Sequence, residues 1–156
     1  MIMMQLAEAV VGDIHEATGR FMRLLRRRFA ENNIVILGEK ILPANFGRHR
    51  LIIVTARNGG VRTYKFYLIY QRRWFESFQK YFGVPAEAAS VNLSILERAV
   101  RHGYDRIVWV SQDGSMFWID PREMKRIVEE RGWIRKTRKT GEEVAHIPLD
   151  YLLRLG

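Results

Sequence analysis

The chain has 156 residues, of which 26 are lysine or arginine and 17 are aspartate or glutamate, so its formal net charge at neutral pH is +9. Twenty of the 26 cations are arginines, and cysteine is absent, which excludes disulfide frameworks, thiol nucleophiles and cysteine-ligated zinc fingers. This balance indicates a polyanionic partner, because a basic surface attracts phosphate polymers and the planar arginine side chain binds phosphate through two donors.

The length of the chain predicts a single domain over residues 1–156, and the sequence contains no internal repeat or low-complexity linker. The apolar start MIMMQLAEAVVG is too short to span a bilayer and lacks a basic leader, so we expect it to pack as a terminal helix and expect no membrane partner. The missing cysteine favours a cytoplasmic protein, or one in the host cytoplasm if it is viral. The preference for arginine favours a thermophilic source.

The first clear element is an amphipathic helix over residues 13–32. Its apolar positions recur at steps of three and four residues, and Asp13 and Glu16 have the spacing of a capping box. The opposite face is cationic and carries Arg20, Arg23 and Arg27. This helix therefore presents one side to a core and the other to solvent or to an anion.

Three strands are predicted next, over residues 34–42, 51–56 and 61–70. The sequence Asn58-Gly59-Gly60 between the last two is a strong hairpin signal. Because Leu51 to Val54 are all apolar, we expect the second strand to be covered on both faces. An antiparallel meander thus follows the first helix.

Two helices are expected after the meander. The segment QRRWFESFQKYFG places aromatic residues on one side of a short helix that ends at Gly83, and a second helix begins near Asn92 and ends before Gly103. Between them, VPAEAAS is typical of a loop.

Strands over residues 106–110 and 116–119 flank a tight turn at Asp113-Gly114. Asp120, Pro121 and Glu123 then have the order of a helix start, and that helix should run to Arg131. The tail contains WIRKTRKTG, whose composition suits a flexible basic arm, a strand over residues 144–147 and a final helical turn. The whole order predicts an α/β (α+β) fold, with a mixed central sheet flanked by helices.

This order of elements resembles the restriction-endonuclease-like, PD-(D/E)XK nuclease superfamily, to which archaeal and viral accessory nucleases belong. The resemblance covers residues 13–119 and is carried by GRFMRLLRRRF, FGRHRLIIV, TYKFYLIYQRR and DRIVWVSQDGSMFWI. It implies a core of helix, three-strand meander, helix and strand that binds duplex DNA. It also implies Mg²⁺ or Mn²⁺ held by clustered carboxylates, which would activate water for phosphodiester hydrolysis.

The acids that this superfamily uses are not in their usual places. Arg48, His49 and Arg50 stand where the second strand would open with a metal-binding acid, and the third strand ends in Tyr70-Gln71 instead of an acid, a spacer and a lysine. If a carboxylate site exists, it is assembled from other positions.

The candidate catalytic residues are acids near the predicted sheet edge and first helix, together with one lysine and one histidine: Glu16, Glu76, Glu87, Lys65 and His49. Glu87 is the candidate metal ligand, because it stands alone among small residues in a turn-prone segment; the alternative is an exposed loop glutamate. Glu39 is a further acid near the sheet edge. For Glu16 the alternative is helix capping, and for Lys65 it is a solvated lysine.

Four basic clusters are the candidate nucleic-acid contacts, and we expect them to form one continuous groove. They comprise Arg20, Arg23, Arg27, Arg48, Arg50, Arg72, Arg73, Arg135, Lys136, Arg138 and Lys139.

Two functions of different classes follow from these patterns. The first is a small metal-dependent DNA endonuclease with an atypical carboxylate site, acting on double-stranded DNA, with a homodimer as an open alternative to a monomer. The second is a non-catalytic DNA- or RNA-binding protein on a degenerate nuclease-like scaffold, which needs no cofactor. A third possibility, an interaction or virion-packing protein with an acidic protein partner, is also open.

Overall fold

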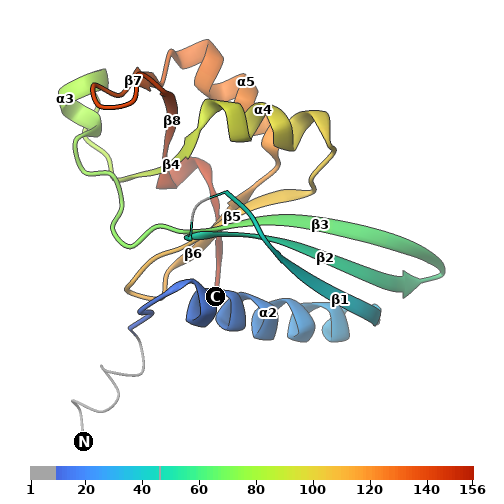
Figure 1. Ribbon diagram of the computed structural model, residues 1–156. Helices are drawn as coiled ribbons and strands as arrows, with labels where there is room; N and C mark the ends of the chain where they lie inside the picture. The colour runs from blue at the N-terminus through green and yellow to red at the C-terminus, as the bar shows by residue number, and fades with distance from the viewer. Residues whose placement is uncertain (1–9, 46) are drawn as a thin grey trace, which may run out of the picture.

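The computed structural model describes residues 10–45 and 47–156 (Figure 1). The helices are α2 (Ile14–Glu31), α3 (Phe78–Phe82), α4 (Leu93–Arg101), α5 (Pro121–Arg131) and the short 3₁₀ helix η1 (Leu149–Tyr151). The strands are β1 (Val35–Pro43), β2 (His49–Asn58), β3 (Gly60–Tyr70), β4 (Ala88–Asn92), β5 (Arg106–Val110), β6 (Met116–Ile119), β7 (Ile134–Lys136), β8 (Glu143–Pro148) and β9 (Leu153–Leu155). The expected terminal helix falls mainly on residues 1–9, outside the described residues.

Six strands form one mixed sheet in the order β1-β2-β3-β5-β6-β9. The first three are an antiparallel meander, and the turn between β2 and β3 lies at the predicted place, where Gly59 has the left-handed φ of 78° that favours glycine. β3 pairs in parallel with β5, whereas β5, β6 and β9 pair antiparallel. The predicted mixed sheet flanked by helices is therefore confirmed.

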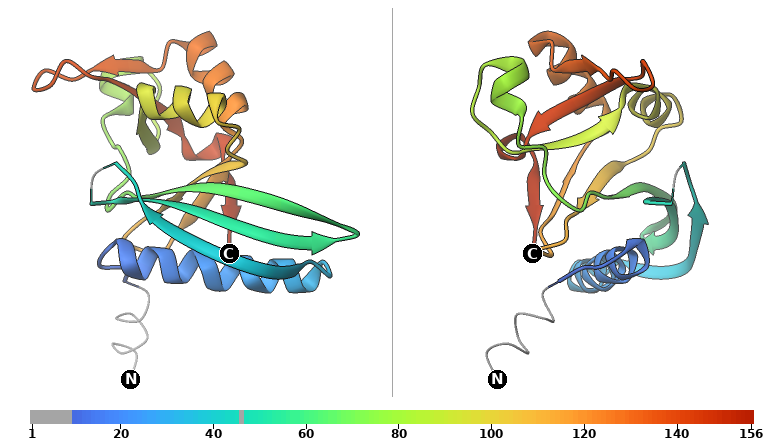
Figure 2. Two further views of the ribbon diagram at one scale, coloured as in Figure 1. Left: turned by 45° about the vertical axis from the view of Figure 1, so that its right-hand side comes forward. Right: turned by 60° about the vertical axis from the view of Figure 1, so that its left-hand side comes forward.

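The helix α2 lies along one face of this sheet (Figures 1 and 2). It begins as predicted: the Asp13 carboxylate accepts a hydrogen bond from the amide of Glu16 at 2.9 Å, and the Glu16 carboxylate accepts one from the amide of Gly12 at 2.7 Å. Its apolar stripe packs on alternate strand residues such as Phe66 and Leu68. Alternation along β3 thus assigns half of its side chains to this core.

The other face of the sheet is covered by α3, α4, α5 and a second, three-stranded sheet in the order β4-β8-β7. The hydrophobic core on this side of the large sheet contains the strand residues that alternate with those facing α2, including Tyr67 and Ile69, and the fully buried Trp109. The indole nitrogen of Trp109 donates a hydrogen bond to the carbonyl of Ser90 at 2.9 Å, which joins the two sheets.

Two predictions of local structure are wrong, and in both cases pairing with another strand decides the conformation. Residues at the end of the predicted VPAEAAS loop belong to β4, which pairs with β8. The expected flexible basic arm begins with β7, and its Thr137 amide donates to the carbonyl of Glu142, so the arm is an ordered hairpin. The predicted helical turn after Pro148 is confirmed as η1, and beyond it the chain forms β9, which pairs with β6 and was not predicted.

Two burial predictions are also wrong. The short helix expected in QRRWFESFQKYFG is confirmed as α3, which ends at Gly83, but its aromatic side chains are not all buried: Phe78 is fully buried, whereas Tyr81 is 47% exposed. In β2, the side chains of Leu51 and Ile53 are only partly buried, because α2 covers the other face of the strand. Among residues 10–45 and 47–156, no helix has the length and apolarity needed to cross a bilayer.

Replacing Phe21 with alanine should lower the free energy of unfolding by about 3–5 kcal/mol, because this fully buried ring packs edge-on against Phe66 and Trp118 between α2 and the sheet. Urea denaturation followed by circular dichroism measures the change. Val61→Ala, at a position that is 65% exposed, is the control and should change stability by less than about 0.5 kcal/mol. Equal effects of the two variants would contradict this packing.

Candidate nucleic-acid interface

Two hollows on the surface are lined by cations and, among the described residues, by no carboxylate. The central hollow lies at the junction of the two sheets and is lined by Arg48, His49, Ile69, Tyr70, Gln71, Arg72, Arg73 and Ser90. The hairpin hollow lies beside the β7–β8 turn and is lined by Lys80, Tyr81, Arg135, Lys136, Thr137, Arg138, Lys139 and Thr140. We call these two hollows together the basic surface.

Part-buried hydrogen bonds link the two hollows through His146. Ser90 lines the central hollow, Arg135 lines the hairpin hollow, and His146 lies between them. The ring of His146 is bonded to the Ser90 hydroxyl through Nδ1 at 2.7 Å and to the Arg135 guanidinium through Nε2 at 3.3 Å. A chain of hydrogen bonds from Ser90 through His146 to Arg135 thus connects the two hollows.

The ion pairs of the protein lie away from the basic surface. Within residues 10–45 and 47–156, the cations that form salt bridges are Arg26, Arg62, Arg122, Lys125 and Arg126. None of them lines either hollow. Because like charges repel when they are gathered without counter-charges, this arrangement leaves the basic surface able to attract an anion.

The segment between β3 and β4 is held in place by Gln71. Its backbone amide donates to the carbonyl of Val110 at 3.0 Å, and its side-chain oxygen accepts a hydrogen bond from the amide of Ser90 at 2.9 Å. Its side-chain nitrogen donates to the carbonyls of Arg73 and Ala88. Gln71 therefore fixes the backbone that carries two arginines of the central hollow.

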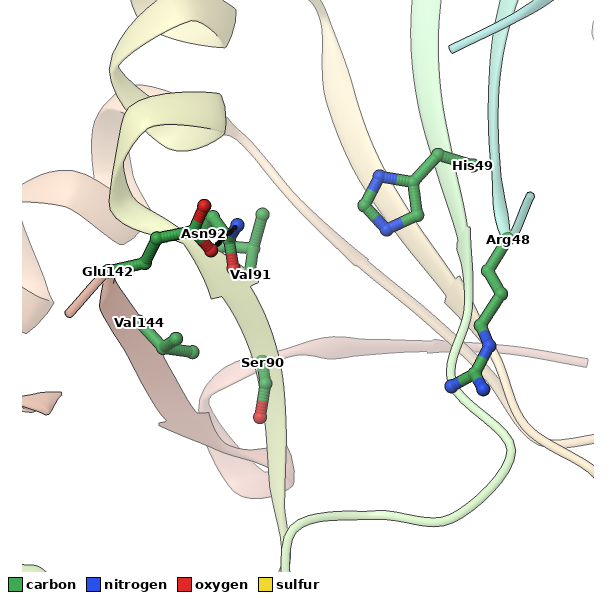
Figure 3. A pocket seen from close by; sticks show the side chains of 7 residues that line it. All are labelled: Arg48, His49, Ser90, Val91, Asn92, Glu142 and Val144. Carbon is green, nitrogen blue, oxygen red and sulfur yellow. Dashed lines mark hydrogen bonds between the residues drawn. The ribbon is translucent and has the colours of Figure 1, made fainter. Parts of the chain in front are cut away.

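His49 and Arg48 form one wall of a further hollow beside the central one, and β4 forms the opposite wall (Figure 3). On that opposite wall, the side-chain nitrogen of Asn92 donates to the Glu142 carboxylate at 3.1 Å. The Nδ1 atom of His49 lies 2.6 Å from the hydroxyl oxygen of Tyr67. The central hollow and this neighbour share Arg48, His49 and Ser90, so they adjoin each other, and Glu142 lines the neighbour and not the central hollow.

Burial, and secondarily the charge of Arg48, lowers the pKa of His49 to about 4. The same two effects, with Arg135 as the neighbouring charge, lower the pKa of His146 to about 3. Both rings are therefore neutral at pH 7, and the positive charge of the central hollow comes from arginine alone.

The predicted catalytic acids are divided among separate places. Glu76 and Glu87 come together with Asp113 in an acidic hollow that shares Arg72 and Arg73 with the central hollow. Glu16 lies at the start of α2, where its carboxylate caps the helix and lines another hollow with Arg20 and Arg23.

The remaining candidates lie elsewhere. Glu39 on β1 is bonded to Arg26 of α2, which lowers its carboxyl pKa through that hydrogen bond. Lys65 lies in mid-strand, where its amide donates to Asp105. It is six residues from Gln71 along the chain, or roughly 20 Å in extended backbone.

The described carboxylates do not form a metal site. Within residues 10–45 and 47–156, no group of three or more histidine or acidic side chains is arranged to hold an ion. In the acidic hollow, one Asp113 oxygen already accepts hydrogen bonds from the amide and hydroxyl of Ser115. The donor set that the predicted Mg²⁺ or Mn²⁺ would require is therefore not assembled from these residues.

The structure places the predicted nucleic-acid contacts on three surfaces. The basic surface takes Arg48, Arg72, Arg73, Arg135, Lys136, Arg138 and Lys139. Arg20, Arg23 and Arg27 follow one side of α2 instead. Arg50 lies on the α2 side of β2, opposite His49, because neighbouring strand residues point to opposite faces.

Two residues that organise this interface were not predicted from the sequence: Gln71 and Ser90. Ser90 and His146 are 56 residues apart in the chain and meet only because β4 pairs with β8. No local pattern signals that pairing.

No family model matches the chain, and no curated protein matches its sequence. Among solved structures, the chain is similar to D212, a nuclease from a fusselovirus, with a TM-score of 0.55 and 13% sequence identity. The similarity covers 90% of this chain and 84% of D212. The chain has the fold of a viral nuclease. At this identity the similarity establishes the fold, and the resemblance to the narrower PD-(D/E)XK superfamily stays an interpretation of the sequence.

Lowering the pH from 7 to 5 should reduce the free energy of unfolding by about 2 kcal/mol through His146 alone. The unfolded histidine, with a pKa near 6.5, takes up a proton in this range, whereas the folded one with its pKa of about 3 does not, so stability is lost as the pH falls. Urea denaturation at both pH values should show a larger loss in the wild type, because the lowered pKa of His49 adds to it in the same direction, and a loss smaller by about 2 kcal/mol in His146→Gln. His102→Gln, at an exposed position, is the matched control and should keep the wild-type dependence.

Proposed function

We propose that this protein binds nucleic acid through the basic surface, with double-stranded DNA as its first candidate partner. The observation that carries the proposal is the gathering of eight cations in two connected hollows without a lining carboxylate, while the ion pairs of the described residues lie elsewhere. Arginine and lysine at such positions neutralise backbone phosphates and release their counterions. The fold shared with a viral nuclease supports the same partner class.

Aromatic side chains add to this proposal at the hairpin hollow. The guanidinium of Arg135 lies 4.9 Å from the ring centre of Tyr81, and the ammonium of Lys80 lies 5.5 Å from it. Because Tyr81 is 47% exposed, its ring is accessible to an unstacked base as well as to cations. Single-stranded DNA and RNA therefore belong in the binding comparison beside duplex DNA, and a homodimer stays part of the proposal for a duplex.

Arg72→Gln/Arg73→Gln should weaken DNA binding and lower the magnitude of the slope of log affinity against log salt. The expected change in slope is about 0.9 for each phosphate contact removed from a duplex. Fluorescence anisotropy with a labelled oligonucleotide at several salt concentrations measures both quantities.

The matched control is Arg122→Gln/Arg126→Gln, which removes two exposed arginines that are paired with acids. It should leave the slope close to that of the wild type. If both double variants change the slope equally, binding follows net charge and not the basic surface. Competition by heparin as strong as by DNA would favour an acidic protein as the partner.

The second candidate function is phosphodiester cleavage by an atypical carboxylate site. It is favoured by one observation: Glu76, Glu87 and Asp113 line a hollow that shares two arginines with the central hollow, so a phosphate bound there would lie beside acids. Glu87 is exposed on the segment that precedes β4. An exposed carboxylate at this place is accessible to a bound strand.

Glu87→Ala should abolish cleavage of linear and supercoiled DNA if this second function is correct, and should leave DNA affinity within about twofold. The assay compares Mg²⁺, Mn²⁺ and EDTA, with product measured on gels. Glu97→Ala, at an exposed position on α4, is the control. Intact substrates with the wild-type protein under every condition would leave binding alone as the function.

A further inference from the structure

Three neighbouring polar side chains lie on the three-stranded sheet: Ser90, His146 and Arg135. Ser90 on β4 is paired in register with His146 on β8, and Arg135 lies on the neighbouring strand β7. His146 is only 1% exposed and stacks on the ring of Phe75, with 3.9 Å between the ring centres. This histidine is therefore fixed in position and in the partners of both its nitrogens.

The hydrogen bonds determine which nitrogen of His146 carries its proton. The arginine side chain has donors only, so Nε2 of His146 must accept the bond from Nε of Arg135. Since the ring is neutral at pH 7, its single N–H is on Nδ1 and donates to the Ser90 hydroxyl oxygen. His146 therefore does not act as a base toward Ser90, and the hydroxyl hydrogen of Ser90 is available to another acceptor.

The backbone of Ser90 is held just as firmly. Its amide donates to the side chain of Gln71, and its carbonyl accepts the indole N–H of Trp109. Ser90 lines the central hollow, which encloses about 540 Å³ and carries the exposed arginines Arg48, Arg72 and Arg73. One fixed neutral donor and three cations thus border the same space.

We propose that the central hollow is a binding site for a single phosphate group, with the Ser90 hydroxyl donating a hydrogen bond to a phosphate oxygen and Arg48, Arg72 and Arg73 balancing its charge. A phosphate oxygen is an acceptor that matches both kinds of donor. The proposal rests on nucleic-acid binding for the source of the phosphate, which is either an internal phosphodiester or a terminal phosphate of a strand.

A neutral donor and a charged one leave different signatures in binding. Ser90→Ala should weaken oligonucleotide binding roughly 5- to 10-fold with an unchanged salt slope, because a hydroxyl displaces no counterion. Arg48→Gln should weaken binding and also lower the magnitude of the slope by about 0.9. Ser90→Thr keeps the hydroxyl and should bind within about twofold of the wild type.

The matched controls are Ser94→Ala, at an exposed position on α4, and Arg57→Gln, at the far end of β2. Both should leave affinity and slope unchanged. Equal effects of Ser90→Ala and Ser94→Ala, or wild-type affinity for Ser90→Ala, would overturn the site while leaving nucleic-acid binding intact. Oligonucleotides with and without a 5′-phosphate distinguish the two sources: loss of the Ser90 effect without it indicates a terminal phosphate, and an undiminished effect indicates an internal one.

Inorganic phosphate tests the site independently of nucleic acid. It should raise the melting temperature of the wild type and of Ser90→Thr, and raise that of Ser90→Ala less. This result without any oligonucleotide binding would reject the proposed function and support the phosphate site.

The tautomer of His146 gives a third readout, through the ¹⁵N chemical shifts of its ring. A proton on Nδ1 is the expected result. A proton on Nε2 would overturn the site, because the Ser90 hydroxyl would then donate to His146.

Discussion

The junction between the two sheets at Ser90 is the constraint on which the basic surface depends. Trp109 from the large sheet and Gln71 from the end of β3 bind the backbone of this residue, and His146 binds its side chain. These bonds join β4 to the end of β3 and to β5, so the arginines that follow Gln71 face β4 as an opposite wall. These few hydrogen bonds fix the backbone that carries the exposed arginines. Breaking them would leave donors and acceptors without partners, which raises the free energy of the folded protein.

Charge is distributed unequally around this junction. The described salt bridges join α2 to β1, join β3 to the residue before β5, and lie at the start and along the exposed side of α5. The hollows at the junction keep their arginines without such partners, and the acids nearest to them lie in adjoining hollows. An anion that enters the central hollow therefore meets cations first and acids only at its margins.

The fold and the basic surface have different sources in this protein. The fold follows from a helix, a meander and a parallel crossover, and it is shared with D212 at 13% identity. Where the resemblance to the PD-(D/E)XK superfamily would place acids, the chain has Arg48, His49 and Arg50 on the second strand and Tyr70-Gln71 at the end of the third. A fold does not by itself fix the chemistry of a site, because packing depends on apolar periodicity and a site depends on a few polar residues.

The sequence by itself determined α2, the β1–β2–β3 meander, the β5–β6 hairpin and α5, because each is specified by local signals: an acid at the helix start, a glycine turn or an apolar period. It also identified most cations of the basic surface as candidates. Only the tertiary structure decided β4 and β9, which form by pairing with strands distant in the chain, and β7, which pairs with β8 in a hairpin where the sequence predicted a flexible arm. Only the tertiary structure brings Ser90 into contact with His146. Only the tertiary structure also places Glu76 and Glu87 in the acidic hollow and leaves Glu16 and Lys65 outside it. Contacts between residues far apart in sequence have no local pattern, so composition predicts the partner class and long-range strand pairing determines the site.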